Sequence, residues 1–309
     1  MAARTGTTLR SRLSRKLRFQ KYLLLMCVPA FTIVLIFHYI PIYGITIAFK
    51  DFIAARGIHG SPWVGFKHFS IFFQNPFWWR ITRNSLLLGF YSILFAFPAP
   101  IILALLFNEL KSQPFKRVTQ TISYFPNFVS TVIIVGMLKE FAGSGGLFNQ
   151  IRNTLGLETI LYFTRPQYFR PLFIGSDIWQ GIGFGTILYL AALSTVDPTL
   201  YDVAVIDGAN RWQRVWRISI PSISPTIIIL LILRMGSILA IDWQKVLLMY
   251  HPGIYETADV IGTFVYREGI EGARFSYTAA VGLMQNAVAF VLLVLANQIS
   301  KSLSETSLW

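Results

Sequence analysis

The residues best suited to chemistry on a ligand stand close together in one apolar stretch, residues 222–248. They combine two cations, an acid, an amide and an aromatic ring: Arg234, Asp242, Trp243, Gln244 and Lys245. An aromatic face beside hydrogen-bonding groups suits a sugar ring, which has apolar CH faces and hydroxyl edges. A cation beside them would attract a carboxylate, most strongly where water is scarce. This stretch is therefore the first candidate for a ligand path.

Two interpretations of these charges stay open. Charged side chains at bilayer depth are costly unless paired or wetted, so they mark a functional site by default. Arg234 suits an internal ion pair equally well, and Asp242 and Lys245, three residues apart, would meet on one helix face. Gln285 and Asn286 are further candidates for the path, although an asparagine at mid-span also bonds neighbouring helices.

The elements that must position these residues are membrane helices. Of the 309 residues, 54% are hydrophobic and only 13% are charged, about half the charged share of an ordinary soluble domain. A span needs about 20 mostly apolar residues. Six stretches qualify: 22–48, 84–108, 118–141, 172–194, 222–248 and 277–299. The fold class predicted is an all-α polytopic membrane protein with six transmembrane helices.

Prolines and glycines qualify this prediction. Pro41 and Pro98 lie inside the first two stretches, and such kinks are tolerated when neighbouring groups satisfy the freed carbonyls. Three glycines in the fourth stretch predict close helix packing: Gly181, Gly183 and Gly185. The single cysteine, Cys27, excludes an intrachain disulfide, and no processing site follows it, so the first stretch is expected to remain as an anchor.

The distribution of positive charge predicts the orientation. Residues 1–21 hold seven of the 27 Lys and Arg residues and no acid. With the N-terminus inside, 14 Lys and Arg fall on the cytoplasmic side and ten in external loops, as the positive-inside rule requires. We therefore expect both termini in the cytoplasm, a basic tail (1–21) that meets anionic lipid, and no nucleic-acid partner. The remainder, 22–309, forms one transmembrane domain with a core at about 80–299.

Several chemistries lack their usual residues. No G-x-x-x-x-G-K-[ST] motif is present, so the chain has no P-loop for ATP. The four histidines are scattered, and we predict no metal site. No pair of carboxylates lies within a predicted span, which disfavours a glycan-cleaving membrane enzyme. A secondary transporter would usually show inverted repeats or intramembrane acids. We predict no catalytic residue.

The loop between the fourth and fifth stretches, about 195–221, has strong helix signals. Asp197 followed by a proline predicts an N-cap. A first helix is expected to end at Asp207-Gly208, and a second to run from about Arg211 until Pro221 closes it. Such a helix–glycine–helix unit either lies on lipid headgroups or docks into a partner.

This loop resembles the EAA loop of ABC importer permeases. The family pattern E-A-A-x-x-D-G-A, with a downstream proline, is matched by Asp202-Val-Ala-Val-Ile-Asp-Gly-Ala209 and Pro221. Asp202 replaces the usual glutamate, which shortens the acid by one methylene, and Val203 replaces the first alanine. The resemblance implies contact with an ATPase by Asp202, Ala204, Asp207, Gly208, Ala209 and Arg211.

The resemblance extends over about residues 60–309, in blocks such as 169–198, 225–239 and 255–270, and is to the LplB-type permeases of the MalF/UgpA group. It implies a bacterial cell (inner) membrane permease paired with a second permease, two ATPase subunits and an extracytoplasmic solute-binding protein. The partner ATPases would bind ATP and Mg²⁺, and this chain no cofactor. In the family, the segment matching Asp242-Trp243-Gln244 contacts carbohydrate. Lys245 and Arg234 then favour an acidic oligosaccharide, of alginate or pectin type, over a neutral one.

Overall fold

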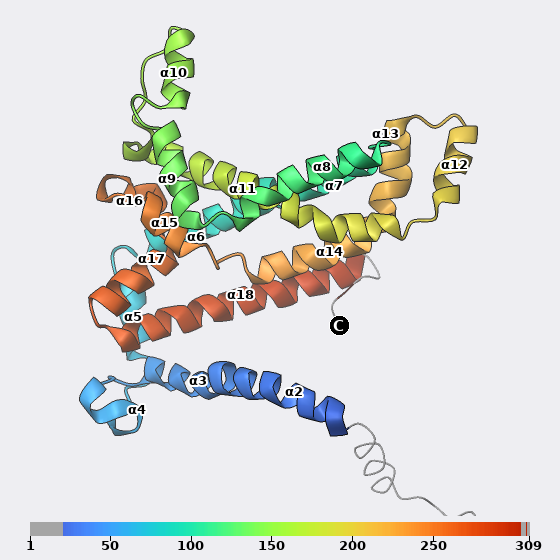
Figure 1. The fold of residues 1–309 in the computed structure, drawn as a ribbon. Coiled ribbons are helices and arrows are strands. Elements are labelled where there is room, and N and C mark those ends of the chain that lie inside the picture. Colours follow the sequence, from blue (N-terminus) through green and yellow to red (C-terminus); the bar gives the residue numbers. More distant parts are fainter. Residues whose placement is uncertain (1–20, 304–306, 308–309) are drawn as a thin grey trace, which may run out of the picture.

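The computed structural model describes residues 21–303 and Ser307, and nearly all of them are helical (Figure 1). Within this part of the chain the extended pairing is a single isolated bridge between Lys50 and Trp63. The basic tail predicted at 1–21 lies outside the described residues, apart from Lys21, which begins the first described helix.

The helices have the following bounds in chain order: α2 (Lys21–Val34), α3 (Ile40–Ile42), α4 (Gly57–Gly60), α5 (Lys67–Gln74), α6 (Trp78–Tyr91), α7 (Pro98–Asn108), α8 (Gln113–Tyr124), α9 (Thr131–Phe141), α10 (Leu147–Thr154), α11 (Pro166–Ser194), α12 (Pro198–Ile206), α13 (Arg211–Arg214), α14 (Ile220–Gly236), α15 (Trp243–Met249), α16 (Tyr255–Ala258), α17 (Ile261–Tyr266) and α18 (Phe275–Leu303). The N-terminal end of α2 and the C-terminal end of α18 lie at the same end of the bundle as α12 and α13 (Figure 1). We call this the α12 end. Helices α5, α10 and α15–α17 lie at the opposite end, the α16 end.

The helices provide the predicted membrane spans. Four continuous stretches are long and apolar enough to cross a membrane: Lys21–Phe49, Trp78–Asn108, Arg211–Gly236 and Phe275–Ser302. Two bent pairs bring the number to six: Gln113–Phe128 with Thr131–Phe141, and Pro166–Ser194 with Pro198–Ile206. In the second pair the 29-residue α11 is itself long enough to span, and α12 follows it at a bend of 74°. The all-α, six-span prediction is confirmed.

Three helix-interrupting prolines are absorbed by one π-helical turn each. The turns are Leu35–Tyr39 before Pro41, Ser92–Ala96 before Pro98 and Val215–Ser219 before Pro221. In each, the N–H of the residue preceding proline donates to a carbonyl five residues back. The wider turn accommodates the missing donor and the ring, so the helix continues. The prediction that Pro221 ends the second loop helix is therefore wrong, because that helix runs unbroken from Arg211 to Gly236.

The fifth span begins and ends earlier than predicted. Helix α14 ends at Gly236, and α15 begins only at Trp243, so residues 222–248 are not one helix. The intervening backbone is held by side chains: the Gln285 amide donates to the carbonyl of Leu239 at 2.7 Å. A break at membrane depth is tolerated where neighbouring polar groups form hydrogen bonds with the backbone groups that the break leaves unpaired.

The third span is also bent. Its two halves, Gln113–Phe128 and Thr131–Phe141, meet at 98°. The Ser130 hydroxyl caps the second half by accepting the N–H of Ile133 at 3.4 Å. Helix α11 packs between α7 and α8 through two of the glycines. A Cβ at Gly183 would collide with the backbone of Ser123, and one at Gly185 with the Pro100 ring.

Candidate functional site

A cavity of about 500 Å³ opens between α7, α11 and α14. Its polar lining comes from Asn127, Asp177, Gln180, Tyr189, Arg234 and Ser237. A smaller cavity of about 140 Å³ shares three of these residues, Asp177, Arg234 and Ser237, and adds Asp242. We call the larger space the charged cavity, because it is lined by one acid, Asp177, and one cation, Arg234.

Arg234 is the accessible cation of this cavity. Its side chain, on α14, is exposed, and its guanidinium donates to the hydroxyl of Ser92. No ion pair within the described residues includes Arg234. A hydroxyl partner leaves the positive charge uncompensated, so the internal ion pair considered for Arg234 is absent from this part of the chain.

Lys245 has a different environment from the one predicted. It is 1% exposed, and its ammonium lies 3.5 Å from an Asp177 carboxylate oxygen and 5.0 Å from the Phe173 ring centroid. At that distance the pair with Asp177 is electrostatic, without a short hydrogen bond. Asp242 does not pair with the Lys245 side chain; its carboxylate instead accepts the backbone N–H of Lys245 at 3.1 Å and caps α15.

Asp177 was missed in the sequence analysis, although its signal was present. It is an acid inside the predicted span 172–194, and such residues mark functional sites by default. Only the fold shows that it faces both the charged cavity and Lys245.

The other predicted path residues are divided by the break in the fifth span. Trp243 stacks on Tyr266 with ring centroids 5.1 Å apart, and both line a separate cavity of about 440 Å³ together with Gln285. Gln244 and Asn286 are exposed and line none of these three cavities. The structure thus brings Arg234 and Asp242 together in the smaller cavity and Trp243 and Gln285 together in the separate one.

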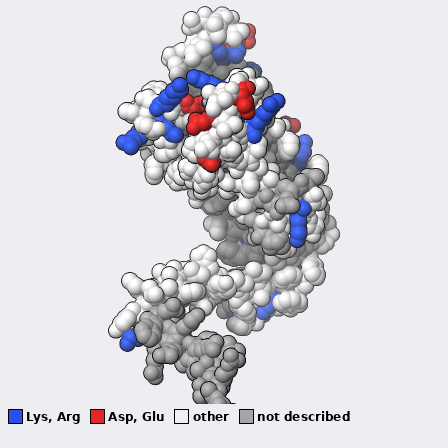
Figure 2. Space-filling view, turned by 90° about the vertical axis from the view of Figure 1, so that its right-hand side faces the viewer, with Lys and Arg blue, Asp and Glu red and all other residues white. Residues whose placement is uncertain are grey.

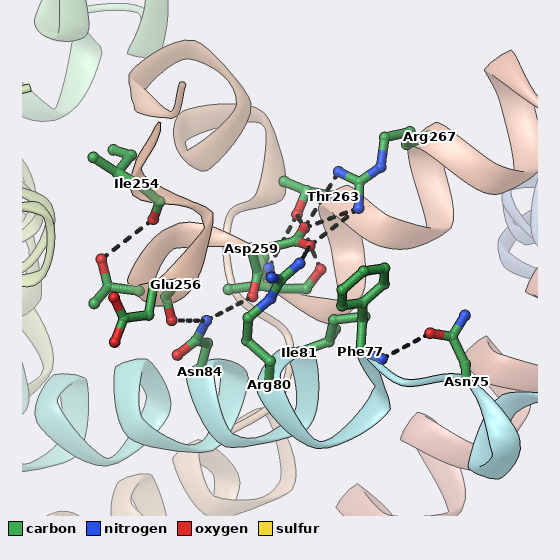
Figure 3. A network of polar contacts seen from close by, with 12 residues as sticks. Asn75, Phe77, Arg80, Ile81, Asn84, Ile254, Glu256, Asp259, Thr263 and Arg267 are labelled. Atoms are coloured by element: carbon green, nitrogen blue, oxygen red, sulfur yellow. Dashed lines mark hydrogen bonds and ion pairs between the residues drawn. The ribbon is translucent and has the colours of Figure 1, made fainter. Parts of the chain in front are cut away.

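At the α16 end, a buried carboxylate ties together three parts of the chain (Figure 3). Asp259, whose side chain is fully buried, accepts hydrogen bonds from Arg80 at 3.2 Å and Arg267 at 3.1 Å. The Thr263 hydroxyl donates to it at 3.1 Å. Burial disfavours the Arg267 cation, but the hydrogen bond and charge of Asp259 outweigh this and raise the pKa of Arg267.

Asn84 extends this network. Its amide donates to the carbonyls of Glu256 and Asp259 at 2.9 and 3.0 Å, and its oxygen accepts from Arg170 at 3.0 Å. Helix α6 and the α16–α17 segment are thereby joined (Figure 3), and Arg170 adds α11. In the sequence these arginines counted only as loop charges. Arg80 and Arg170 have partners 179 and 86 positions away, so no local signal identified the network.

At the α12 end, the helix–glycine–helix unit is present. Asp197 accepts the N–H of Thr199 at 2.9 Å, which caps α12 and lowers the pKa of its carboxyl. Gly208 has φ of +77°, a conformation that favours glycine. Asn210 and Gln213 form a capping box for α13. The predicted local structure of the loop is confirmed up to Pro221.

The surface of this unit is open to a partner. Asp202, Asp207, Gly208 and Arg211 are exposed, whereas Ala204 and Ala209 are half-buried. Large apolar side chains are also exposed: Ile206 by 84% and Trp212 by 74%. Figure 2 shows acidic side chains gathered at this end with Lys and Arg around them. One contact leads back into the bundle, between the Tyr201 hydroxyl of α12 and the buried Ser219 hydroxyl at 3.0 Å.

Comparison with known proteins identifies relatives over nearly the whole length. The family described as binding-protein-dependent transport system inner membrane component matches residues 96–304. Protein LplB of Bacillus subtilis (strain 168) is 42% identical over 294 residues, covering 95% of this chain and 92% of that protein. The polygalacturonan/rhamnogalacturonan transport system permease protein YteP of the same organism is 40% identical, covering 97% and 94%.

A solved structure is similarly close. It is the crystal structure of a bacterial alginate ABC transporter in complex with an alginate pentasaccharide-bound periplasmic protein, and one of its chains is 40% identical to this one. The match has a TM-score of 0.87 and covers 96% of this chain and 100% of that chain.

Proposed function

The chain belongs to the family of binding-protein-dependent transport system inner membrane components, and we propose that its charged cavity passes an acidic oligosaccharide. It is a permease subunit of a sugar ABC importer in the inner membrane, and not an enzyme. It works with a second permease, separate ATPase subunits and a substrate-binding protein.

The observation that supports an acidic substrate is that Arg234 has no counter-charge paired with it among the described residues. A cation at membrane depth is costly without a partner, and this one faces an open cavity with a hydroxyl as its only described hydrogen-bond partner. A carboxylate arriving on a sugar would supply the missing charge. Charge-assisted hydrogen bonds of this kind are roughly twice as strong as neutral ones.

The relatives are consistent with this choice. YteP is named for polygalacturonan and rhamnogalacturonan, and a second solved relative, 40% identical, for the import of the acidic polysaccharide alginate. Trp243 stacked on Tyr266 would offer a face to the sugar ring, with Gln285 beside it. We assign Asp242, Gln244 and Asn286 to the same path, and Asp242 lines a described cavity on it. Lys245, which is buried beside Asp177, belongs to the path through its charge.

The exposed α12–α13 unit is our proposed contact with the ATPase, through Asp202, Ala204, Asp207, Gly208, Ala209 and Arg211. In this arrangement ATP and Mg²⁺ are bound by the ATPase subunits. The α12 end would then face the cytoplasm with both termini, and the α16 end would face the solute-binding protein.

The test is ATPase stimulation in the complete importer, reconstituted with its solute-binding protein. Uronate oligomers should stimulate hydrolysis more than neutral oligomers of equal length. Arg234→Gln should reduce the uronate response roughly tenfold, the scale of one charged hydrogen bond, and Arg234→Lys should retain most of it. Stimulation by neutral oligomers alone would refute the acidic substrate and leave the permease assignment intact.

A further inference from the structure

The two charges that line the charged cavity have opposite signs. Arg234 contributes a cation and Asp177 an acid whose side chain is 35% exposed. Taken alone they would cancel, and the cavity would not prefer an anion. The preference proposed above therefore depends on what happens to the charge of Asp177.

Lys245 neutralises the charge of Asp177 from outside the charged cavity. It does not line the charged cavity and is 1% exposed, with its ammonium 3.5 Å from Asp177. The ring of Phe173, one turn before Asp177 on α11, also lies 5.0 Å from the same ammonium. Burial strengthens the Coulomb attraction between the two charges because the local dielectric is low, and it makes an ammonium without a counter-charge costly. With Asp177 neutralised, Arg234 is the net charge that a ligand meets.

The break in the fifth span makes this arrangement possible. Arg234 and Lys245 are 11 residues apart, about three turns of a continuous helix, so an unbroken span would present both cations on one face. Because α14 ends at Gly236 and α15 starts at Trp243, Lys245 is directed instead toward α11.

We propose that Lys245 is a specificity-determining residue that never touches the substrate: it sets the net charge of the cavity by neutralising Asp177. This inference rests on the proposed acidic substrate. Asp242 lines the smaller cavity and caps α15, so the acid and the cation that line the charged cavity itself remain Asp177 and Arg234. The geometry makes Lys245 a positioning residue for charge, not a ligand for the uronate.

The prediction concerns a ratio, the stimulation of ATPase activity by uronate oligomers divided by that by neutral oligomers of equal length. Lys245→Met should lower this ratio about tenfold, since Asp177 then opposes Arg234; charge pairs at this range commonly contribute that much. Asp177→Asn should keep the ratio or raise it. The double variant Asp177→Asn/Lys245→Met restores the net charge and should return the ratio to that of the wild type.

The wild type, the two single variants and the double variant together distinguish a charge effect of Lys245 from a structural role and from direct contact with the substrate. A purely structural role for the pair would lower both responses together and leave the ratio unchanged in Lys245→Met, which would overturn the inference. A double variant as impaired in its ratio as Lys245→Met would also overturn it, since it would indicate direct contact by Lys245. If Lys245→Met does not assemble, the ratios of Asp177→Asn and the double variant decide. Failure of the wild type to respond to uronates would instead refute the proposed substrate.

Discussion

The two ends of the bundle are held together in different ways. At the α16 end, hydrogen bonds join residues 172 to 179 positions apart, and one of them, from Arg80, reaches the fully buried carboxylate of Asp259. At the α12 end, the caps join residues two or three positions apart, and most side chains are exposed. The first end is a network that resists deformation, and the second is a preformed unit with a free face, which suits a part that docks and moves.

The largest effect should come from a bulky residue at Gly208. Gly208→Trp should abolish substrate-stimulated ATPase activity in the assembled importer, because a bulky side chain would stand on the surface proposed to contact the ATPase. The membrane fold should stay intact, because the glycine lies on an exposed turn with no atom within 4 Å of an added Cβ. Its φ of +77° adds about 1 kcal/mol of local strain. Gly208→Asn is the matched control, since asparagine tolerates this conformation. Normal stimulation in Gly208→Trp would contradict a docking role for the loop.

The second effect concerns stability at the α16 end. Asp259→Asn leaves Arg80 and Arg267 without their shared counter-charge, and breaking a buried ion pair from one side costs about 3–5 kcal/mol. The variant should show a clearly lower melting temperature in detergent. Glu268→Gln is the control, because its pair with Arg274 is partly exposed and should contribute about 0–1 kcal/mol. Equal losses in the two variants would argue against the difference between the ends.

A smaller effect should follow from cutting the link between α12 and the bundle. Tyr201→Phe removes the hydrogen bond to Ser219, at the end of the π-helical turn, which contributes about 1 kcal/mol. We expect substrate-stimulated ATPase activity to fall about fivefold while basal activity is kept. Ser224→Ala removes a hydroxyl whose described bond is local, to the carbonyl of Pro221, and should leave stimulation unchanged. The same loss in both variants would show that α12 acts without this link.

The least perturbing test asks which side of the membrane each end faces. In a Cys27→Ser background, a cysteine at the exposed Ala55 should react with an impermeant reagent added outside intact cells, and one at the exposed Asn210 should not. The reverse pattern would invert the proposed orientation of both ends.

The sequence determined those features that depend on neighbouring residues. Long apolar runs predicted six spans because a helix must be about 20 residues long to cross the hydrocarbon core. Asp197 and Gly208 predicted a cap and a turn because each acts on backbone groups within a few positions. The EAA-like pattern from Asp202 to Ala209 pointed to the permease family for the same reason: all of its residues lie on one short segment.

Tertiary structure decided the features that depend on distant residues. The sequence pattern placed Lys245 near Asp242, yet its partner is Asp177, 68 positions earlier in the chain. The break after Gly236 also depends on a distant residue, because Gln285 of another helix satisfies the carbonyl of Leu239. A buried charge must find its counter-charge wherever the fold brings one within reach. Which cation faces the cavity was therefore set by the packing of α11, α14 and α15, and not by the order of residues along the fifth span.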